Sequence, residues 1–204
     1  MTFVVAYMVL NEASYFRKTL ENELMLIEPE SSCLIVIDMQ ERLVPAMQAP
    51  ARTIKNAATL MKAAHVLSVP TVLTEQYPKG LGHTVPELIA ISEGAPVLEK
   101  LHFSCMKDTG FAKHFKSLNR KQAVIAGMEA HICVLQTGMN LMEQGYEIFI
   151  VTDATSSRTP ESEKACLDRL SAAGAGIVTT EMVVFEWLGQ AATPEFKELL
   201  PLMK

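Results

Sequence analysis

The segment Gln122-Ala-Val-Ile-Ala-Gly-Met-Glu-Ala-His-Ile-Cys-Val134 decides how this sequence folds. An apolar run, residues 123–126, breaks at Gly127, and apolar residues at helical spacing follow Cys133. This pattern predicts a strand, a tight turn and a helix, with a thiol in the first helical turn. Unpaired backbone N–H groups and the positive end of the helix dipole lie there, and both favour a thiolate. We therefore expect Cys133 to be a nucleophile, provided that a base and a cation lie nearby.

On both sides of this segment, short apolar runs alternate with stretches of helical spacing. Such alternation predicts a parallel sheet covered by helices on both faces. We expect an α/β protein, a three-layer α/β/α sandwich around a six-stranded, mainly parallel sheet with the Rossmann-like strand order 3-2-1-4-5-6. The expected strands are residues 33–38, 69–74, 96–100, 123–126, 146–153 and 175–179. The expected helices are residues 51–67, 86–92, 107–118, 132–144, 160–173, 181–190 and 194–203.

The composition narrows the class of protein. The chain has 204 residues, of which 49% are hydrophobic, and a formal net charge of −5. Mild acidity without a basic cluster argues against a nucleic-acid partner, and no apolar run reaches the roughly 18 residues that a membrane span needs. The four cysteines lack CxxC spacing. We therefore expect reduced thiols in an intracellular protein, with the cytoplasm as the expected compartment and organelle targeting left open.

The first 24 residues differ from the rest of the chain. Residues 1–10 are apolar, but no basic region precedes them and no small-residue cleavage site follows, which argues against a secretory signal. Residues 11–24 are polar and helix-prone. We expect residues 1–24 to be an extension of uncertain order without catalytic residues, and residues 25–204 to form one domain.

Three residues able to do chemistry stand at the ends of expected strands: Asp38, Lys100 and Cys133. In open parallel sheets, ligands bind outside the carboxyl ends of the strands. We interpret the set as catalytic: Asp38 takes the thiol proton and returns it to a leaving group, while Lys100 favours both the thiolate and an ionised Asp38. N–H groups of the turn would form an oxyanion hole. The alternative interpretation is a helix cap, a solvated lysine and a packing cysteine.

Other residues near these strand ends are weaker candidates. The loop after the second strand and the segment after Lys100 offer substrate-binding candidates, which are Glu75, Gln76, Tyr77, His102 and Phe103. They could equally be loop or interface residues. His131 is expected to face away from Cys133 on the opening helix, and Cys105 is either an oxidisable second thiol or a packing residue. Arg158 is expected to cap the next helix or to contact a neighbouring subunit.

Three motifs carry a resemblance to a known family. Val-Ile-Asp38-Met-Gln, Val-Leu-Glu-Lys100 and Ala-Gly-Met-Glu-Ala-His-Ile-Cys133-Val together resemble the isochorismatase-like cysteine hydrolase superfamily. The segment Leu73-Thr-Glu-Gln-Tyr-Pro-Lys-Gly-Leu-Gly82 resembles a narrower branch, the isochorismatase-domain-containing proteins. The similarity covers about residues 30–204.

The resemblance implies a role for each residue. Cys133 would be the nucleophile, Asp38 the general base, and Lys100 the residue that orients and stabilises charge. A cis peptide bond would join Met128 and Glu129, and the N–H groups of Glu129 and Cys133 would form the oxyanion hole. The implied reaction is attack on a planar carbonyl carbon, loss of an amine and hydrolysis of a thioester.

Departures from related subfamilies limit the function. Metal-dependent nicotinamidases carry an Asp-x-His segment and a second His, whereas this chain offers only Glu75 and His83 there, and a metal site usually needs three protein ligands. We therefore expect no metal and no cofactor. True isochorismatases lack the cysteine, so their activity is not implied. The expected function is a metal-independent cysteine hydrolase of a small amide or related C–N substrate, in a homo-oligomer. A non-catalytic protein-interaction role and a thiol sensor are the alternatives.

Overall fold

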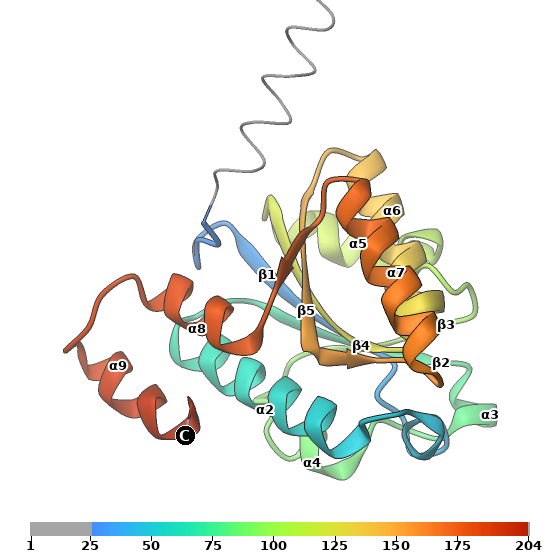
Figure 1. Ribbon diagram of the computed structural model, residues 1–204, viewed down its shortest axis with the longest axis horizontal. Helices are drawn as coiled ribbons and strands as arrows, with labels where there is room; N and C mark the ends of the chain where they lie inside the picture. The colour runs from blue at the N-terminus through green and yellow to red at the C-terminus, as the bar shows by residue number, and fades with distance from the viewer. Residues whose placement is uncertain (1–25, 204) are drawn as a thin grey trace, which may run out of the picture.

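Six parallel strands form one sheet in this protein, for which a computed structural model describes residues 26–203 (Figure 1). The strand order is β3-β2-β1-β4-β5-β6, and each neighbouring pair is parallel. The predicted fold class and strand order are therefore confirmed. The strands are β1 (Ser32–Ile37), β2 (Thr71–Gln76), β3 (Val97–Lys100), β4 (Gln122–Met128), β5 (Glu147–Ser156) and β6 (Gly176–Val178).

Helices cover both faces of the sheet (Figure 1). On one face lie α2 (Pro50–Val66), α4 (Pro86–Ile89), α8 (Thr180–Leu188) and α9 (Pro194–Leu199), and on the other α5 (Thr109–Ser117), α6 (Leu135–Glu143) and α7 (Pro160–Ala172). Each face has its own hydrophobic core. Because side chains alternate along a strand, Val36 of β1 packs in the first core and its neighbours Ile35 and Ile37 in the second.

The boundaries differ from the sequence prediction where the local pattern is weak. The predicted fifth strand ended at residue 153, where the apolar residues give way to polar ones. In the structure, β5 continues to Ser156, and the polar residues Thr155 and Ser156 are buried. Helix α3 (Pro78–Leu81) lies in a segment predicted as loop, since four residues are too few to show helical periodicity. A π-helical turn, η3 (Ala130–Val134), precedes α6. Residues 1–24 lie outside the described range, within which no helix is long and apolar enough to cross a membrane.

Gly127 allows β4 to approach β1 at the point where the chain enters its turn. Its φ is +137°, and a Cβ added there would lie 2.2 Å from the carbonyl oxygen of Ile37. Only glycine adopts this conformation at such a separation without strain. The close approach places the turn after β4 beside Asp38, the residue that follows β1.

Replacing Gly127 by Ala should destabilise the fold. We expect a loss of about 2–3 kcal/mol or more in the free energy of unfolding, because the new methyl group meets backbone rather than a movable side chain. Gly110→Ala is the matched control, since a Cβ at Gly110 meets nothing within 4 Å. Urea denaturation of both variants makes the comparison, and equal stabilities would contradict the packing argument.

Candidate active site

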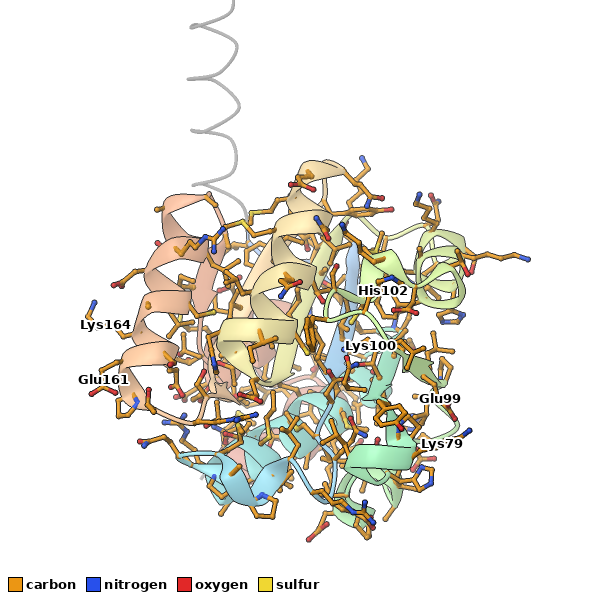
Figure 2. All side chains as sticks on the ribbon, turned by 90° about the vertical axis from the view of Figure 1, so that its right-hand side faces the viewer. Lys79, Glu99, Lys100, His102, Glu161 and Lys164 are labelled. Carbon is orange, nitrogen blue, oxygen red and sulfur yellow. The ribbon has the colours of Figure 1, made fainter. Side chains whose placement is uncertain are left out.

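The carboxyl ends of β1, β3 and β4 bring the three predicted residues together. Lys100 Nζ lies 2.7 Å from Asp38 Oδ2, and their side chains are 1% and 0% exposed. Cys133 is 5% exposed, and its thiol lies close enough to Asp38 and Lys100 for both charges to shift its pKa. In Figure 2, Lys100 lies near the centre of the molecule, whereas Lys79 and Lys164 lie at its outer surface. The sequence therefore identified a real cluster.

Strand β2 lies between β1 and β3 and holds both charged groups. Thr74 Oγ1 donates to Asp38 Oδ1 at 2.7 Å, and Lys100 Nζ donates to Gln76 Oε1 at 2.7 Å. Lys100 Nζ also donates to the carbonyl oxygens of the second and third residues after it, at 3.3 and 3.2 Å. Gln76 is held in turn by Gln40, whose Oε1 accepts from the Gln76 amide at 2.7 Å. Sequence reasoning missed Thr74, although it stands two residues from Gln76 and therefore on the same face of β2.

Glu75 points to the opposite face of β2 and is occupied there. Its Oε1 accepts from the amide and hydroxyl of Thr84 at 2.6 and 2.8 Å, and its Oε2 lies 3.0 Å from His83 Nδ1. Burial opposes ionisation of Glu75, but the hydrogen bonds from Thr84 and His83 outweigh it, so the pKa of Glu75 is lowered. Glu75 is therefore a buried strand residue and not the loop residue that was predicted, and its contacts with Thr84 and His83 favour a structural role over substrate binding.

The remaining substrate-binding candidates lie at the rim. Tyr77 and Phe103 are each 52% exposed. His102 is exposed as well, and its Nδ1 lies 3.1 Å from Asp108 Oδ2. His102 and Phe103 contact Lys100 through their backbone carbonyls rather than their side chains. Their contact with a substrate stays a prediction.

The resting thiol differs from the sequence expectation. Burial raises the pKa of Cys133, the negative charge of Asp38 raises it further, and Lys100 offsets only part of this. These effects oppose the thiolate that the start of a helix favours. Burial also raises the pKa of Asp38, against the lowering effects of Lys100 and Thr74. Burial opposes the charge on Lys100, but Asp38 and nearby thiols more than compensate, so the pKa of Lys100 is raised.

The turn that carries Cys133 leaves backbone donors available. The peptide bond between Met128 and Glu129 is cis, as the resemblance implied. The amides of Ile132 and Val134 both donate to the Glu129 carbonyl oxygen, at 3.1 and 3.3 Å. Within residues 26–203, the Glu129 amide has no acceptor, and the Cys133 amide has none outside its own π-helical turn. An amide such as that of Glu129, on the turn that carries the thiol, suits the charge that develops on a carbonyl oxygen under attack.

Unpaired polar atoms gather at this edge of the sheet. In the described part of the chain, the buried side-chain polar atoms without a hydrogen bond are Asp38 Oδ2, Ser104 Oγ and Glu129 Oε2. The Asp38 atom has Lys100 as an ion-pair partner, but without the angle of a hydrogen bond. Buried polar groups are almost always paired. The two atoms left without a close partner, Ser104 Oγ and Glu129 Oε2, follow the ends of β3 and β4 and indicate a place for a polar ligand or water.

Two further candidates have structural partners. His131 directs Nδ1 to Ser157 Oγ at 2.9 Å, and its Nε2 lies 3.7 Å from Glu129 Oε2, which supports the expectation that it faces away from Cys133. Cys105 is fully buried, its amide donates to Thr137 Oγ1 at 3.0 Å, and burial raises the pKa of its thiol to about 12. These contacts favour packing as the role of Cys105.

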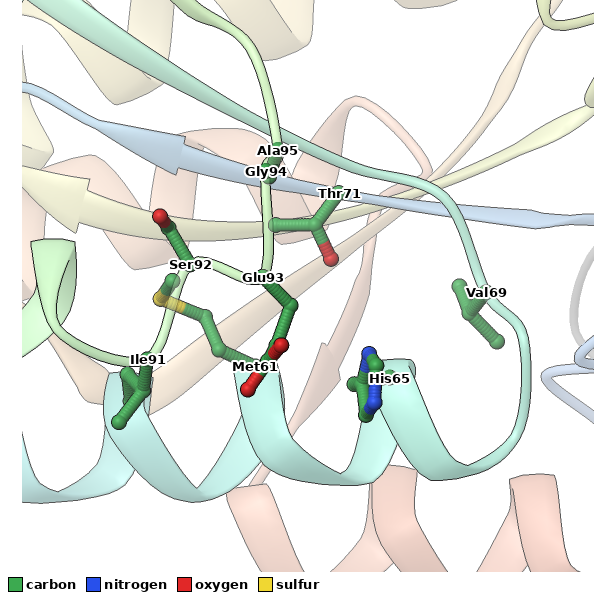
Figure 3. A pocket seen from close by; sticks show the side chains of 9 residues that line it. All are labelled: Met61, His65, Val69, Thr71, Ile91, Ser92, Glu93, Gly94 and Ala95. Atoms are coloured by element: carbon green, nitrogen blue, oxygen red, sulfur yellow. The ribbon is translucent and has the colours of Figure 1, made fainter.

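A pocket lies away from this cluster, at the other end of the sheet. A cavity of about 200 Å³ lies between α2 and the loop of residues 91–95, with His65, Glu93 and Thr71 in its lining (Figure 3). Because Thr71 begins β2, this cavity lies at the amino ends of the strands, opposite Asp38. Across residues 26–203, no group of three His, Cys, Asp or Glu side chains is placed to hold a metal ion.

Comparison with known proteins gives consistent matches along the chain. Residues 32–182 match the model of the isochorismatase domain. "Isochorismatase domain-containing protein 2" of Danio rerio is 39% identical over 178 residues, which cover 87% of this chain and 89% of the relative. The structure of MAR1 ribonuclease from Caenorhabditis elegans matches with a TM-score of 0.83 and 37% identity, covering 88% of this chain and 92% of that one. The YcaC gene product of Escherichia coli, described as an octameric hydrolase of unknown specificity, matches with a TM-score of 0.82 and 26% identity, covering 87% and 90%.

Replacing the charged neighbours of Cys133 should move its pKa in opposite directions. Asp38→Asn removes a negative charge beside the thiol, so the pKa of Cys133 should fall, whereas Lys100→Met removes a positive charge and should raise it. The pH dependence of Cys133 alkylation by iodoacetamide measures both shifts, because only the thiolate reacts. If the pKa of Cys133 is unchanged or raised in Asp38→Asn, then the charge of Asp38 does not raise the pKa of this thiol.

Proposed function

The chain belongs to the isochorismatase domain family of hydrolases, and from this premise we propose that it is a metal-independent cysteine hydrolase of a small amide or related C–N substrate. The observation that carries the proposal is the buried ion pair of Asp38 and Lys100, which lies close enough to Cys133 for both charges to shift the pKa of its thiol. A thiol, a base and a cation gathered in this way are the components of nucleophilic catalysis. The proposal needs no cofactor.

In the first step, Cys133 Sγ attacks the carbonyl carbon while its proton passes to the Asp38 carboxylate. The raised pKa of Asp38 makes it a stronger base than an exposed carboxylate, which favours this transfer. The amides of Glu129 and Cys133 stabilise the oxyanion, and loss of one such donor typically costs a factor of about 10²–10³ in rate. Lys100 stays protonated and keeps Asp38 in place.

In the second step, the tetrahedral intermediate collapses. Asp38 returns the proton to the leaving nitrogen, the C–N bond breaks, and an amine departs from the Cys133 thioester. Asp38 then takes a proton from a water molecule as that water attacks the thioester carbonyl carbon. The carboxylic acid product leaves, and the proton held by Asp38 returns to the Cys133 sulfur.

We also propose that the protein forms a homo-oligomer. Gln76 and Lys100 are paired in register, so the residues after them, Tyr77 and Leu101, lie close together at the rim. Leu101 is 70% exposed, and Tyr77 and Phe103 are each 52% exposed. Exposed apolar groups that gather in one place indicate an interaction surface. The octameric state in the description of the Escherichia coli relative supports the same proposal.

A small molecule fits this site better than RNA, although the Caenorhabditis elegans relative is named a ribonuclease. The positive charges near Cys133 are already neutralised, since Lys100 pairs with Asp38 and Arg158 pairs with Glu129. Affinity for nucleic acid depends mainly on cations that contact phosphates. The formal net charge of −5 also opposes binding of a polyanion.

A chromogenic ester tests the nucleophile. Incubation with p-nitrophenyl acetate should release p-nitrophenol in a burst and leave one acetyl group on Cys133, detected by peptide mass spectrometry. Cys133→Ser should abolish the burst, and Asp38→Asn should slow it by about 10²-fold or more because the general base is lost. Cys166→Ser, which removes another buried thiol, should behave like the wild type, and so should protein dialysed against EDTA.

Two results would contradict the proposal. Acetylation that persists in Cys133→Ser would exclude Cys133 as the nucleophile. A wild-type protein that reacts stoichiometrically with peroxide but forms no acyl-enzyme would favour the thiol sensor instead.

A further inference from the structure

Glu129 is a buried carboxylate on the turn that carries Cys133. The residue is 5% exposed, and its Oε1 lies 2.6 Å from Arg158 Nη2. The sequence analysis placed Arg158 at a helix cap or a subunit contact, but Thr159 caps α7 by accepting from the Ser162 amide. We infer that Arg158 is a positioning residue, which holds the oxyanion hole in place through the Glu129 side chain. This inference rests on the proposed function, because it requires the Glu129 amide to be an oxyanion donor.

Arg158 belongs to a segment that is held independently of the turn. The Ser157 amide donates to Glu163 Oε2 at 3.2 Å, and the Ser157 carbonyl oxygen accepts from the Gln48 amide at 3.0 Å. The Arg158 carbonyl oxygen accepts from Gln48 Nε2 at 3.3 Å. The guanidinium group therefore projects from a fixed backbone, and its contact with Glu129 limits how far the turn can move.

The turn has a second connection to the same segment. His131 bonds Ser157 Oγ through Nδ1 at 2.9 Å, while its Nε2 lies 3.7 Å from Glu129 Oε2. Among the described residues, Glu129 Oε2 has no hydrogen bond. Arg158 is therefore the main partner of a carboxylate that is almost fully buried. Without it, the charge would be left unpaired, and Glu129 would relieve this by turning toward water and moving its amide.

Stability alone does not explain this pair. The Arg158 side chain is 60% exposed, so water screens its attraction to Glu129. The contact matters because of where Glu129 lies. Its carboxylate binds Arg158, and its amide is the proposed donor to the reacting carbonyl oxygen. A displaced donor weakens transition-state stabilisation without affecting the thiol itself.

Two reactions of Cys133 separate the effect of Arg158 on the oxyanion hole from any effect on the thiol itself. Acylation by p-nitrophenyl acetate passes through a tetrahedral oxyanion, whereas alkylation by iodoacetamide displaces iodide at a saturated carbon and forms no oxyanion. The ratio of the two rates therefore reports the oxyanion hole. Arg158→Ala should slow acylation by at least about tenfold, a fraction of the 10²–10³ that loss of a donor costs, and change alkylation by less than about twofold.

Rescue by guanidinium ions distinguishes a positioning role of Arg158 from a merely structural one. Because Arg158 is 60% exposed, its removal leaves a space open to solvent beside Glu129, and added guanidinium should restore part of the acylation rate. Arg169→Ala is the matched control, since it removes the same charge from the exposed face of α7. It should leave both rates unchanged and should not respond to guanidinium.

A double variant completes the test. If Arg158 acts through Glu129, the pair Glu129→Gln/Arg158→Ala should acylate no more slowly than Glu129→Gln alone. Wild-type acylation in Arg158→Ala, a parallel fall of acylation and alkylation, or no response to guanidinium would each overturn the inference while leaving the proposed function intact. Absence of acylation at Cys133 in the wild-type protein would overturn both.

Discussion

The structure of this site depends on burying one carboxylate and one ammonium group 2.7 Å apart, out of contact with water. Removing two charges from water costs several kcal/mol each, and their attraction compensates only when further hydrogen bonds complete the geometry. Strand β2 supplies these bonds, from Thr74 to Asp38 and from Lys100 to Gln76. The strand order 3-2-1-4 therefore has a chemical consequence. It places β2 between β1 and β3, whose ends carry the two charged residues. It also places β4, which leads to Cys133, on the other side of β1.

The same pair determines the state of the nucleophile. Burial and the Asp38 carboxylate raise the pKa of Cys133, and Lys100 offsets part of this. In the mechanism proposed above, activation comes with the substrate, when the thiol proton moves to Asp38 and the turn's amides stabilise the oxyanion. Interactions that strengthen only in the transition state are those that accelerate a reaction. A buried neutral thiol is also less reactive toward other electrophiles than a resting thiolate.

Sequence analysis predicted the parallel sheet and the cluster of Asp38, Lys100 and Cys133 from local pattern, whereas the strand order was predicted as that of a Rossmann-like fold. An apolar run that ends in a chemically active residue is visible in sequence, and parallel strands bring such ends to one edge. The raised pKa of Cys133 was missed, since burial and the charge of Asp38 arise from tertiary structure. Glu75 was grouped with Gln76 because the predicted strand ended at residue 74, whereas β2 continues to Gln76 and strand alternation puts these neighbours on opposite faces. The contact of Glu129 with Arg158 joins two segments 29 residues apart and has no signal in the local sequence.

The central claim is that the ion pair of Asp38 and Lys100 serves the reaction of Cys133 and does not stabilise the fold. Removing both charges, Asp38→Asn/Lys100→Met, tests this most directly, because asparagine tolerates the positive φ of 52° at residue 38; the free energy of unfolding and the acylation of Cys133 are measured on the same protein. Apolar replacement of a buried pair is often neutral or stabilising by about 1–4 kcal/mol, whereas removing one partner costs about 3–5 kcal/mol. The account predicts a double variant at least as stable as the wild type that no longer acylates Cys133. A double variant that is as unstable as the single variants, or that acylates at the wild-type rate, would contradict it.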